Sequence, residues 1–339
     1  MTFKFDNVYV LSTACVTGPY EKNGPLGHKF DKSYDDLYCN EKTFEQAEVR
    51  LVEESIEILL RKARKSGKDI DLIVGGDLLN QICATSYGIK KFNIPHLGIY
   101  SACSTSTEGM IVAASLIDKN FIKSAIVSTS SHNLSSEKQF RNPVEYGAPK
   151  PSTATFTTTG GTSILLTNSK SRIKVESATV GRICDMGQND PNHMGANMAV
   201  AAGETIMEHL RDTKRDINYY DLIITGDLGI YGKEILKDYL KDEFGIDLLN
   251  NYDDSGTMIY DKDQKETLAG GSGPACSPLV NYSYVIPLIE KGILKKVLIV
   301  ATGALFSPTF IYQKQPILSI SHAVSLESVR WHIYIHFYL

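Results

Sequence analysis

The residues best suited to chemistry lie around Cys103, where a predicted strand ends and a run of small residues begins. The segment reads Leu97-Gly-Ile-Tyr-Ser-Ala-Cys103-Ser-Thr-Ser-Thr-Glu-Gly109 and leads into an apolar stretch typical of a helix. Unpaired N–H groups and the helix dipole at such a position favour a thiolate, and small neighbours let a ligand approach the backbone. The pattern predicts either a ligand-facing, reactive cysteine or an inert one buried among residues that are small for helix packing.

A second polar cluster follows the next predicted strand and contains His132 and Asn133, with Arg141 and Lys150 further along. Open α/β sheets bind ligands at the carboxyl ends of their strands, so His132 and Asn133 are candidates for the same pocket as Cys103. A lone histidine is more often structural, and that alternative stays open. Asp77 and Asn80 occupy the equivalent end of an earlier strand, where Asp77 either faces the ligand or caps a helix.

A sequence repeat indicates that the chain consists of two similar halves. The segment Asp71-Leu-Ile-Val-Gly-Gly-Asp77-Leu is matched by Asp221-Leu-Ile-Ile-Thr-Gly-Asp227-Leu, and Ala102-Cys103-Ser104 is matched by Ala275-Cys276-Ser277. Both matches come in the same order and are followed by an apolar stretch, a short basic junction and a strand. We predict an N-terminal half over residues 1–170, a C-terminal half over residues 171–327 and a divergent tail over residues 328–339.

Short β-branched runs alternate with helical patterns, which indicates an α/β fold with mostly parallel sheets. The predicted strands cover residues 8–15, 72–75, 97–100, 125–129, 164–167, 173–180, 222–225, 297–301 and 317–321. A capping box at Thr43-Phe-Glu-Gln46 begins a helix with Ala47, Leu51, Ser55 and Ile58 on one face. Two further helices are predicted over residues 204–214 and 234–242.

Composition argues against several classes of protein. The 339 residues carry 35 Lys and Arg against 39 Asp and Glu, so the chain lacks the basic surplus expected of a nucleic-acid-binding protein. Its apolar runs are shorter than the roughly 18 residues of a membrane span, and we expect no signal peptide. The six cysteines are scattered without a CxxC pair, which favours a reducing, intracellular setting over a zinc site or a disulfide framework. No resident metal or cofactor is predicted.

Dispersed short segments resemble the stage V sporulation protein AD family of the thiolase-like, or condensing-enzyme, superfamily. The resemblance extends over almost the whole chain and ends at about Leu326. It rests on the segments Asn23-Gly-Pro-Leu-Gly-His28, Gly76-Asp-Leu-Leu-Asn-Gln81, Ala102-Cys-Ser-Thr-Ser106, Ser130-Ser-His-Asn133, Gln139-Phe-Arg141, Ala269-Gly-Gly-Ser-Gly273 and Ala301-Thr-Gly-Ala-Leu305.

This resemblance implies both a fold and a role. The superfamily stacks two βαβ-type halves in five layers (αβαβα) and is usually dimeric, so we expect a homodimer. Similarity to the sporulation family implies binding of dipicolinic acid (pyridine-2,6-dicarboxylate), or its calcium chelate, for uptake into the forespore. The implied partners are other SpoVA membrane proteins, and the implied location is the periphery of the forespore or spore inner membrane.

The catalytic partners of a condensing enzyme are missing from the sequence. The resembling enzymes combine a nucleophilic cysteine with His-His or His-Asn partners from loops of the second half. Here those loops read Gly226-Asp227-Leu228 and Gly270-Gly271-Ser272-Gly273 and contain neither residue type. We therefore expect a binding protein without catalytic residues. The alternative is a divergent acyltransferase that uses Cys103 on an acyl-CoA, with His132 or His322 as a substitute partner.

A planar dicarboxylate requires N–H donors or cations near its carboxylates and a flat apolar wall for its ring. The helix N-terminus at Cys103 and the glycine loop can supply amides, Arg141 or Lys150 can supply charge, and Asp77 can coordinate a calcium ion that arrives with the ligand. The predicted ligand-binding residues are Cys103, Asp77, Asn80, His132, Asn133, Arg141, Lys150, Gly270, Gly271 and Ser272.

Overall fold

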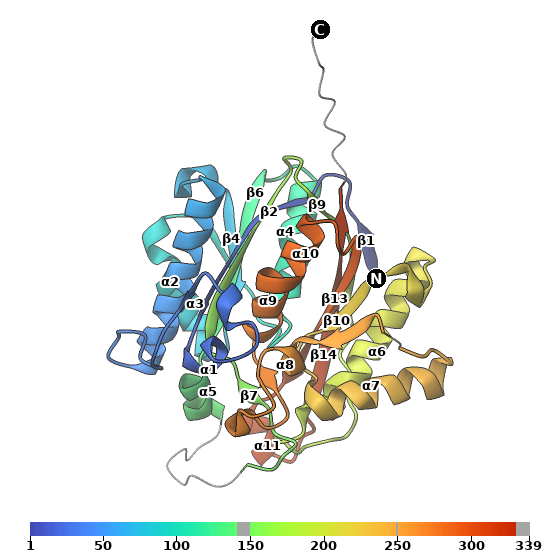
Figure 1. The fold of residues 1–339 in the computed structure, drawn as a ribbon. Helices are drawn as coiled ribbons and strands as arrows, with labels where there is room; N and C mark the ends of the chain where they lie inside the picture. The colour runs from blue at the N-terminus through green and yellow to red at the C-terminus, as the bar shows by residue number, and fades with distance from the viewer. Residues whose placement is uncertain (141–149, 249, 330–339) are drawn as a thin grey trace.

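The computed structural model describes residues 1–140, 150–248 and 250–329 and contains two groups of five strands (Figure 1). Their order across the sheet is β11-β10-β13-β14-β9-β2-β8-β6-β4-β5, and β2 meets β9 at the pairs Tyr9↔Lys174 and Val10↔Ile173. The first group comprises β2 (Tyr9–Thr17), β4 (Leu72–Gly76), β5 (His96–Gly98), β6 (Ser124–Ser131) and β8 (Gly160–Thr167). The second comprises β9 (Ile173–Val180), β10 (Leu222–Thr225), β11 (Tyr252–Asp254), β13 (Lys296–Leu305) and β14 (Leu318–Ser328).

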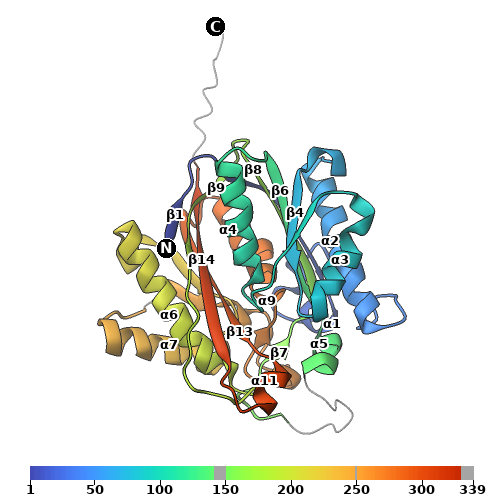
Figure 2. The same cartoon turned by 180° about the vertical axis from the view of Figure 1, so that it is seen from behind.

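Helices cover both faces of each group of strands, which gives five layers (Figures 1 and 2). The outer layers are α2 (Phe44–Ala63) with α3 (Cys83–Ile89) on the first group, and α6 (Met194–Thr213) with α7 (Gly229–Phe244) on the second. The middle layer holds α4 (Thr105–Asp118), α9 (Cys276–Val280) and α10 (Ile286–Glu290), the last two joined by the π-helical turn Asn281–Val285.

The shorter elements lie in the connections. They are the strands β1 (Thr2–Lys4), β3 (Lys32–Ser33), β7 (Phe156–Thr157) and β12 (Gly271–Ser272) and the helices α1 (Pro19–Lys22), α5 (Asn133–Phe140), α8 (Ser255–Met258) and α11 (Pro308–Tyr312). Strands β7 and β12 pair in parallel as a separate two-stranded sheet, which ties the glycine loop of the second half to a loop of the first.

Helix α2 forms as its sequence predicts. The side chain of Thr43 accepts a hydrogen bond from the Gln46 N–H at 3.2 Å, which caps the first turn. Leu51, Ser55 and Ile58 are buried on the predicted face, and the Ser55 hydroxyl bonds to that of Ser163 in β8. The helix ends where Arg64 takes a left-handed conformation with a φ of 53°.

The expectation of mostly parallel sheets is wrong, because each group of strands is mixed. Strand β4 runs parallel to β5 and β6, and β10 runs parallel to β11 and β13, but β2, β8, β9 and β14 pair antiparallel with their neighbours in the two groups. Helices bury both faces of all these strands, so antiparallel strands here show the continuous apolar runs typical of parallel ones. Apolar runs in the sequence therefore do not reveal strand direction in this fold.

The sequence repeat corresponds to a repeated structural contact. Asp71 accepts hydrogen bonds from the N–H groups of Lys123 and Ser124 at 2.7 and 3.0 Å, before β6. Asp221 accepts bonds from Lys295 and Lys296 at 2.6 and 2.9 Å, before β13. Each aspartate thus ties one strand to the start of its neighbour.

The predicted boundary between residues 170 and 171 falls between β8 and β9 and stays a prediction.

Two helices differ from expectation. Helix α6 begins at Met194, ten residues before the predicted start, because its first turns are rich in Gly and Ala and are buried on several sides, which hides the helical period. Helix α5 was not predicted, because its polar sequence lacks an apolar face.

The predicted tail lies largely outside the described residues, since only its first two positions are described.

Candidate functional site

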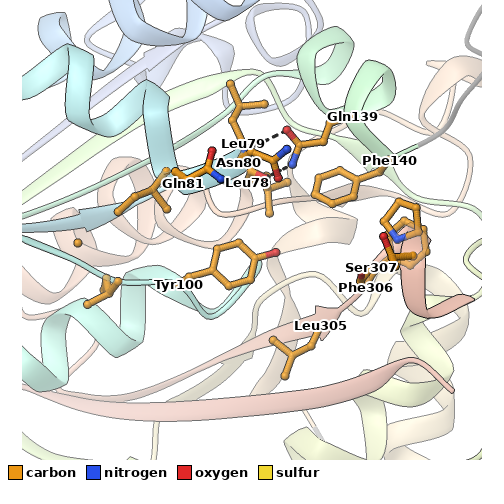
Figure 3. A pocket seen from close by; sticks show the side chains of 15 residues that line it. Leu78, Leu79, Asn80, Gln81, Tyr100, Gln139, Phe140, Leu305, Phe306 and Ser307 are labelled. Carbon is orange, nitrogen blue, oxygen red and sulfur yellow. Dashed lines mark hydrogen bonds between the residues drawn. The ribbon is translucent and has the colours of Figure 1, made fainter. Parts of the chain in front are cut away.

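A cleft of about 710 Å³ opens where loops from both halves meet (Figure 3). It lies between the loop after β4, the loop before α4, helix α5 and the segment after β13. The hydroxyl of Tyr100 points into the cleft, and Phe140 lies across from it (Figure 3). Phe306 packs beside Phe140 with a ring-centre distance of 5.7 Å. The cleft thus has aromatic walls.

A narrow inner cavity of about 50 Å³ leads from the cleft to Cys103. The cavity and the cleft share Leu78, Tyr100, Phe140 and Phe306 in their linings. The further lining residues are Ala102, Cys103, Ser136, Glu137, Thr157, Pro191, Met194, Ser272 and Ala304. The cavity therefore adjoins the cleft, and the Cys103 side chain forms part of its lining.

Cys103 lies on a tight turn between β5 and α4. Ala102 has a φ of +46°, and a main-chain bridge links Ser101 to Cys103, so the chain reverses sharply just before the helix. Strand β13 passes so closely that a Cβ on Gly303 would lie 2.5 Å from the Ser101 carbonyl oxygen. Packing from both halves thus fixes the cysteine, which is only 8% exposed, at the inner end of the cavity.

Asp227, from the loop after β10, lies beside Cys103, and the Ser272 hydroxyl contacts both side chains. The Ser272 Oγ lies 3.6 Å from the Cys103 Sγ and donates a hydrogen bond to the Asp227 Oδ2 at 2.9 Å. The Gly273 N–H and the Thr302 hydroxyl also donate to Asp227, at 3.3 and 2.7 Å. Burial raises the pKa of Asp227 to about 6, against the lowering effect of these donors. The carboxylate is therefore largely ionised at neutral pH.

The expected stabilisation of a Cys103 thiolate by the helix N-terminus is wrong. Burial, and after it the negative charge of Asp227, raises the pKa of Cys103 well above its ordinary value. A helix N-terminus stabilises an anion by about 0.3–1 kcal/mol at exposed sites, which is small against desolvation and a buried like charge. Cys103 is therefore a neutral thiol in this environment.

His132 and Asn133 perform structural roles at the start of α5. The His132 Nε2 donates to the Leu37 carbonyl at 2.7 Å, and its Nδ1 accepts from the Ser135 N–H at 3.4 Å. Burial lowers the pKa of His132 to about 4, so the ring is neutral. Asn133 donates from its side chain to the Thr157 carbonyl at 3.2 Å. Neither residue is among those that line the cleft or the inner cavity.

His322, in β14, also has hydrogen-bond partners at both ring nitrogens. Its Nδ1 accepts from the Gly181 N–H at 3.2 Å, so the neutral ring carries its proton on Nε2, which lies 3.2 Å from the Ser101 hydroxyl. Burial lowers the pKa of His322 to about 4. Both ring nitrogens are thus used within the fold, and the partner of Cys103 is Ser272.

Asp77 accepts hydrogen bonds from the loop after β4 and from the first turn of α3, which agrees with the alternative interpretation that it caps a helix. Its Oδ1 accepts from the Leu79 N–H, and its Oδ2 accepts from the N–H and hydroxyl of Thr85, all at 2.7–2.8 Å. The side chain is fully buried and lines neither the cleft nor the inner cavity. Asn80 does line the cleft, and its N–H donates to the Gln139 Oε1 at 3.0 Å.

The remaining predicted residues divide into near and distant ones. Lys150 forms an ion pair at 2.8 Å with Glu137, which lines the inner cavity. Ser272 lines that cavity, whereas Gly270 and Gly271 form the loop behind it, with a φ of +121° at Gly270. Arg141 lies outside the described residues.

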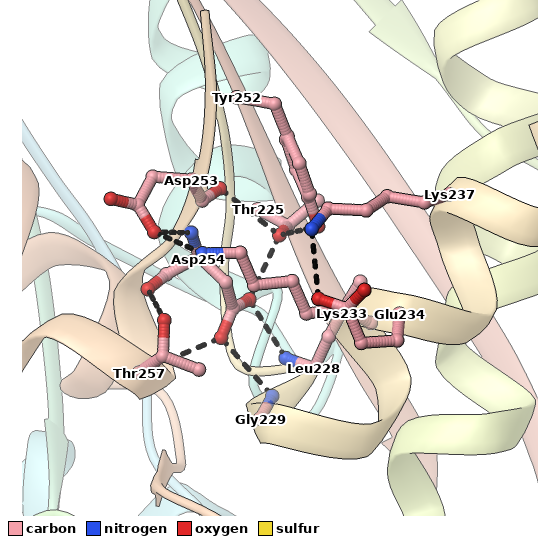
Figure 4. Close-up of polar contacts among 10 residues, drawn as sticks. All are labelled: Thr225, Leu228, Gly229, Lys233, Glu234, Lys237, Tyr252, Asp253, Asp254 and Thr257. Atoms are coloured by element: carbon pink, nitrogen blue, oxygen red, sulfur yellow. Dashed lines mark hydrogen bonds and ion pairs between the residues drawn. The ribbon is translucent and has the colours of Figure 1, made fainter. Parts of the chain in front are cut away.

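A second buried carboxylate, Asp254, supports the loop that carries Asp227 (Figure 4). It accepts from the N–H groups of Leu228 and Gly229 at 3.0 and 3.1 Å, and from the Thr225 hydroxyl at 2.8 Å. These bonds fix the chain on both sides of Asp227, so that its carboxylate points to Ser272 and Thr302.

Asp227, Phe140 and Phe306 are site residues that the sequence analysis did not select. Asp227 had a signal, since it matches Asp77 in the repeat, but nothing in the sequence placed it near Cys103. Phe140 lies in the family segment Gln139-Phe-Arg141, which does not assign it a role, and Phe306 lies outside the family segments. Across the described ranges, no group of three or more His, Cys, Asp or Glu side chains is placed to hold a metal ion. No helix in this part of the chain has the length and apolar character to cross a membrane.

Comparisons with solved structures identify the fold. A variant of OleA from Xanthomonas campestris superposes with a TM-score of 0.61 at 15% identity, covering 96% of this chain and 99% of that one. 3-Oxoacyl-(acyl carrier protein) synthase III from Aquifex aeolicus VF5 superposes with a TM-score of 0.59 at 15% identity, covering 94% and 99%. The five-layer fold is therefore that of the thiolase-like condensing enzymes.

Sequence comparison narrows the relationship from fold to family. The stage V sporulation protein AD of Bacillus subtilis (strain 168) is 46% identical over 327 residues, which cover 96% of each chain. A sequence model of the family described as "Stage V sporulation protein AD (SpoVAD)" matches residues 1–327. The chain therefore belongs to the stage V sporulation protein AD family.

Proposed function

We propose that this protein binds dipicolinic acid, or its calcium chelate, for uptake into the forespore. The observation that carries the proposal is the aromatic-walled cleft that narrows to the neutral Cys103 thiol. Its volume of about 710 Å³ lies within the range of small-molecule sites, about 300–1,000 Å³. Tyr100, Phe140 and Phe306 offer flat faces to a pyridine ring.

Polar groups around the cleft suit the carboxylates of such a ligand. Asn80, Gln81 and Ser307 line the outer part, where amide and hydroxyl groups can donate hydrogen bonds. Lys150 lines neither cavity but forms an ion pair with Glu137, so it offsets the negative charge that Glu137 presents to a ligand carboxylate at the inner cavity. Because both oxygens of Asp77 are occupied, a calcium ion would enter with the ligand and not on a preformed Asp77 site.

The chemistry at Cys103 favours binding over the alternative acyltransferase. A nucleophilic cysteine requires a base or a cationic partner that favours the thiolate. Here the groups that contact the thiol are the Ser272 hydroxyl and the Asp227 carboxylate, whose negative charge disfavours a thiolate, while both histidines considered as substitutes are bonded elsewhere. The enzymes that share the fold therefore provide the architecture but not the proposed reaction.

The same proposal includes partners and location. We place the protein at the periphery of the forespore or spore inner membrane, bound to other SpoVA membrane proteins, as a homodimer. Strand β5 is an edge strand at the end of the sheet, and its Leu97 is 43% exposed, which suits pairing with a second copy. Light scattering of the purified protein tests the dimer.

Isothermal titration of the purified protein with dipicolinate, with and without calcium, tests the function. We expect saturable binding with one site per chain. A parallel incubation with acyl-CoA, followed by mass spectrometry of the Cys103 peptide, tests the alternative. Absence of dipicolinate binding together with acylation of Cys103 would reverse the proposal, and absence of both would leave a scaffold role.

A further inference from the structure

The carboxylate of Asp227 is held in a fully satisfied, buried setting beside Cys103. Hydrogen bonds from Ser272 and Gly273 reach its Oδ2, and a bond from Thr302 reaches its Oδ1. Three donors on one carboxylate favour its ionised form, in opposition to burial. Nothing in the binding of a ligand in the cleft requires this charge, because the side chain is only 1% exposed and lines neither cavity.

The direction of the Ser272 hydrogen bond determines whether the proton or the lone pairs of its hydroxyl face the Cys103 sulfur. A serine hydroxyl carries one proton, and here it points to the Asp227 Oδ2 at 2.9 Å. The lone pairs of the same oxygen therefore face the Cys103 Sγ at 3.6 Å, and the S–H group can donate to this oxygen or to the Asp227 carboxylate, with which it also forms a hydrogen bond. A thiolate in this place would face a lone pair with a carboxylate behind it, which is unfavourable on both counts.

The opposite interpretation is a relay in which Asp227 draws a proton from Cys103 through Ser272. It requires Asp227 to hold a proton more tightly than the thiol does. The pKa of Asp227, about 6, lies below the raised pKa of Cys103, so the proton stays on sulfur. The geometry thus makes Asp227 a stabiliser of the thiol and not a general base.

We infer that Asp227 is a positioning residue that holds Cys103 as a neutral thiol, so that the cysteine at the end of the cavity forms a hydrogen-bonding wall and not a nucleophile. This goes beyond the proposed ligand, since it assigns the chemical state of the cysteine and the residue that, together with burial, maintains this state. The charge of Asp227 and the orientation of Ser272 act together in this role.

The inference is tested by the pH dependence of Cys103 labelling with methyl methanethiosulfonate, a small thiol reagent, in the full chain. Peptide-resolved mass spectrometry separates Cys103 from the other five cysteines. In the wild type, we expect a midpoint well above the value of about 8.5 for an exposed cysteine. In Asp227→Asn, which removes the charge at nearly constant shape, we expect the midpoint to fall by at least about one unit and labelling at pH 7.5 to rise about tenfold.

Ser272→Ala is the matched control, because it disturbs the same loop and keeps the charge of Asp227. We expect its labelling to rise much less than that of Asp227→Asn, whereas general loosening of the loop would accelerate both variants equally. Equal acceleration in both, or an unchanged midpoint in Asp227→Asn, would overturn the inference. If Asp227→Asn does not fold, the wild-type profile decides the state of the thiol, since a midpoint at or below about 8.5 contradicts the assigned state. The assay uses no dipicolinate, so its failure and that of the proposed function are separate results.

Discussion

Asp77 and Asp227 occupy matching positions after β4 and β10, yet their carboxylates accept hydrogen bonds from different parts of the fold. Asp77 bonds only within its own half, to the chain at Leu79 and Thr85. Asp227 bonds to Ser272 and Thr302, and Ser272 in turn lines the cavity at Cys103. The two matching sequence segments thus each place an aspartate after a strand, and Asp227 alone of these two contacts residues around Cys103.

Replacement of Asp77 should affect stability and not ligand affinity. In Asp77→Asn, one of the two oxygens becomes an amide nitrogen that faces the donors of Leu79 or Thr85, and the buried mismatch should lower the free energy of unfolding by about 1–3 kcal/mol. Urea denaturation measures this loss, and the exposed Asp263→Asn is the control, with an expected change within about 0.5 kcal/mol. Equal effects in the two variants would refute the structural role.

Glu21 should make stability fall as pH rises. It is fully buried, accepts hydrogen bonds from Tyr260 and from the Thr159 N–H, and leaves its Oε2 without a partner in the described structure. Burial raises the pKa of Glu21 from 4.5 to about 7. The folded state therefore binds this proton more tightly than the unfolded chain, so stability decreases from about pH 4.5 to about pH 7 and levels off above.

The Glu21→Gln variant isolates this effect, because an amide does not titrate. Relative to the wild type, its free energy of unfolding should rise between pH 5 and pH 8 by up to about 3 kcal/mol. Chemical denaturation at several pH values measures the difference, and the exposed Glu290→Gln should show no such trend. A pH-independent difference for Glu21→Gln would contradict the assignment.

The aromatic wall of the cleft should contribute directly to ligand affinity. Phe140→Ala removes a ring that faces the cleft, and we expect dipicolinate affinity to fall at least about tenfold, since stacked aromatic contacts contribute about 0.5–1.5 kcal/mol beyond buried area. Phe121→Ala, at a position 77% exposed after α4, is the matched control. If both variants bind like the wild type in calorimetry, the ligand lies outside this cleft.

Filling the inner cavity should block the ligand without unfolding the protein. Cys103→Leu places extra volume in a cavity of about 50 Å³, and we expect loss of measurable dipicolinate binding with a stability cost of about 1–3 kcal/mol. Cys184→Leu, at a half-exposed position, controls for the substitution itself. Unchanged affinity in a folded Cys103→Leu protein would place the ligand elsewhere.

Much of the architecture could be predicted because local sequence signals agree with the fold. The capping box at Thr43, the strands over residues 173–180 and 222–225, and the repeat marked by Asp71 and Asp221 all appear in the structure as expected. Strand direction could not be predicted, because helices bury both faces of parallel and antiparallel strands alike. The early start of α6 was hidden by residues too small to show a period.

The sequence by itself determined the family, the duplicated α/β plan and the position of Cys103 before a helix, since each depends on residues that are neighbours along the chain. Only the tertiary structure decided the chemistry of the site. It bonded His132 to the distant Leu37 carbonyl and Asp77 to the nearby Leu79 N–H, brought Phe140 and Phe306 together as a wall, and placed Asp227 beside Ser272. A pKa depends on burial and on charges distant in sequence, so the expected thiolate became a thiol only once both halves had packed around Cys103.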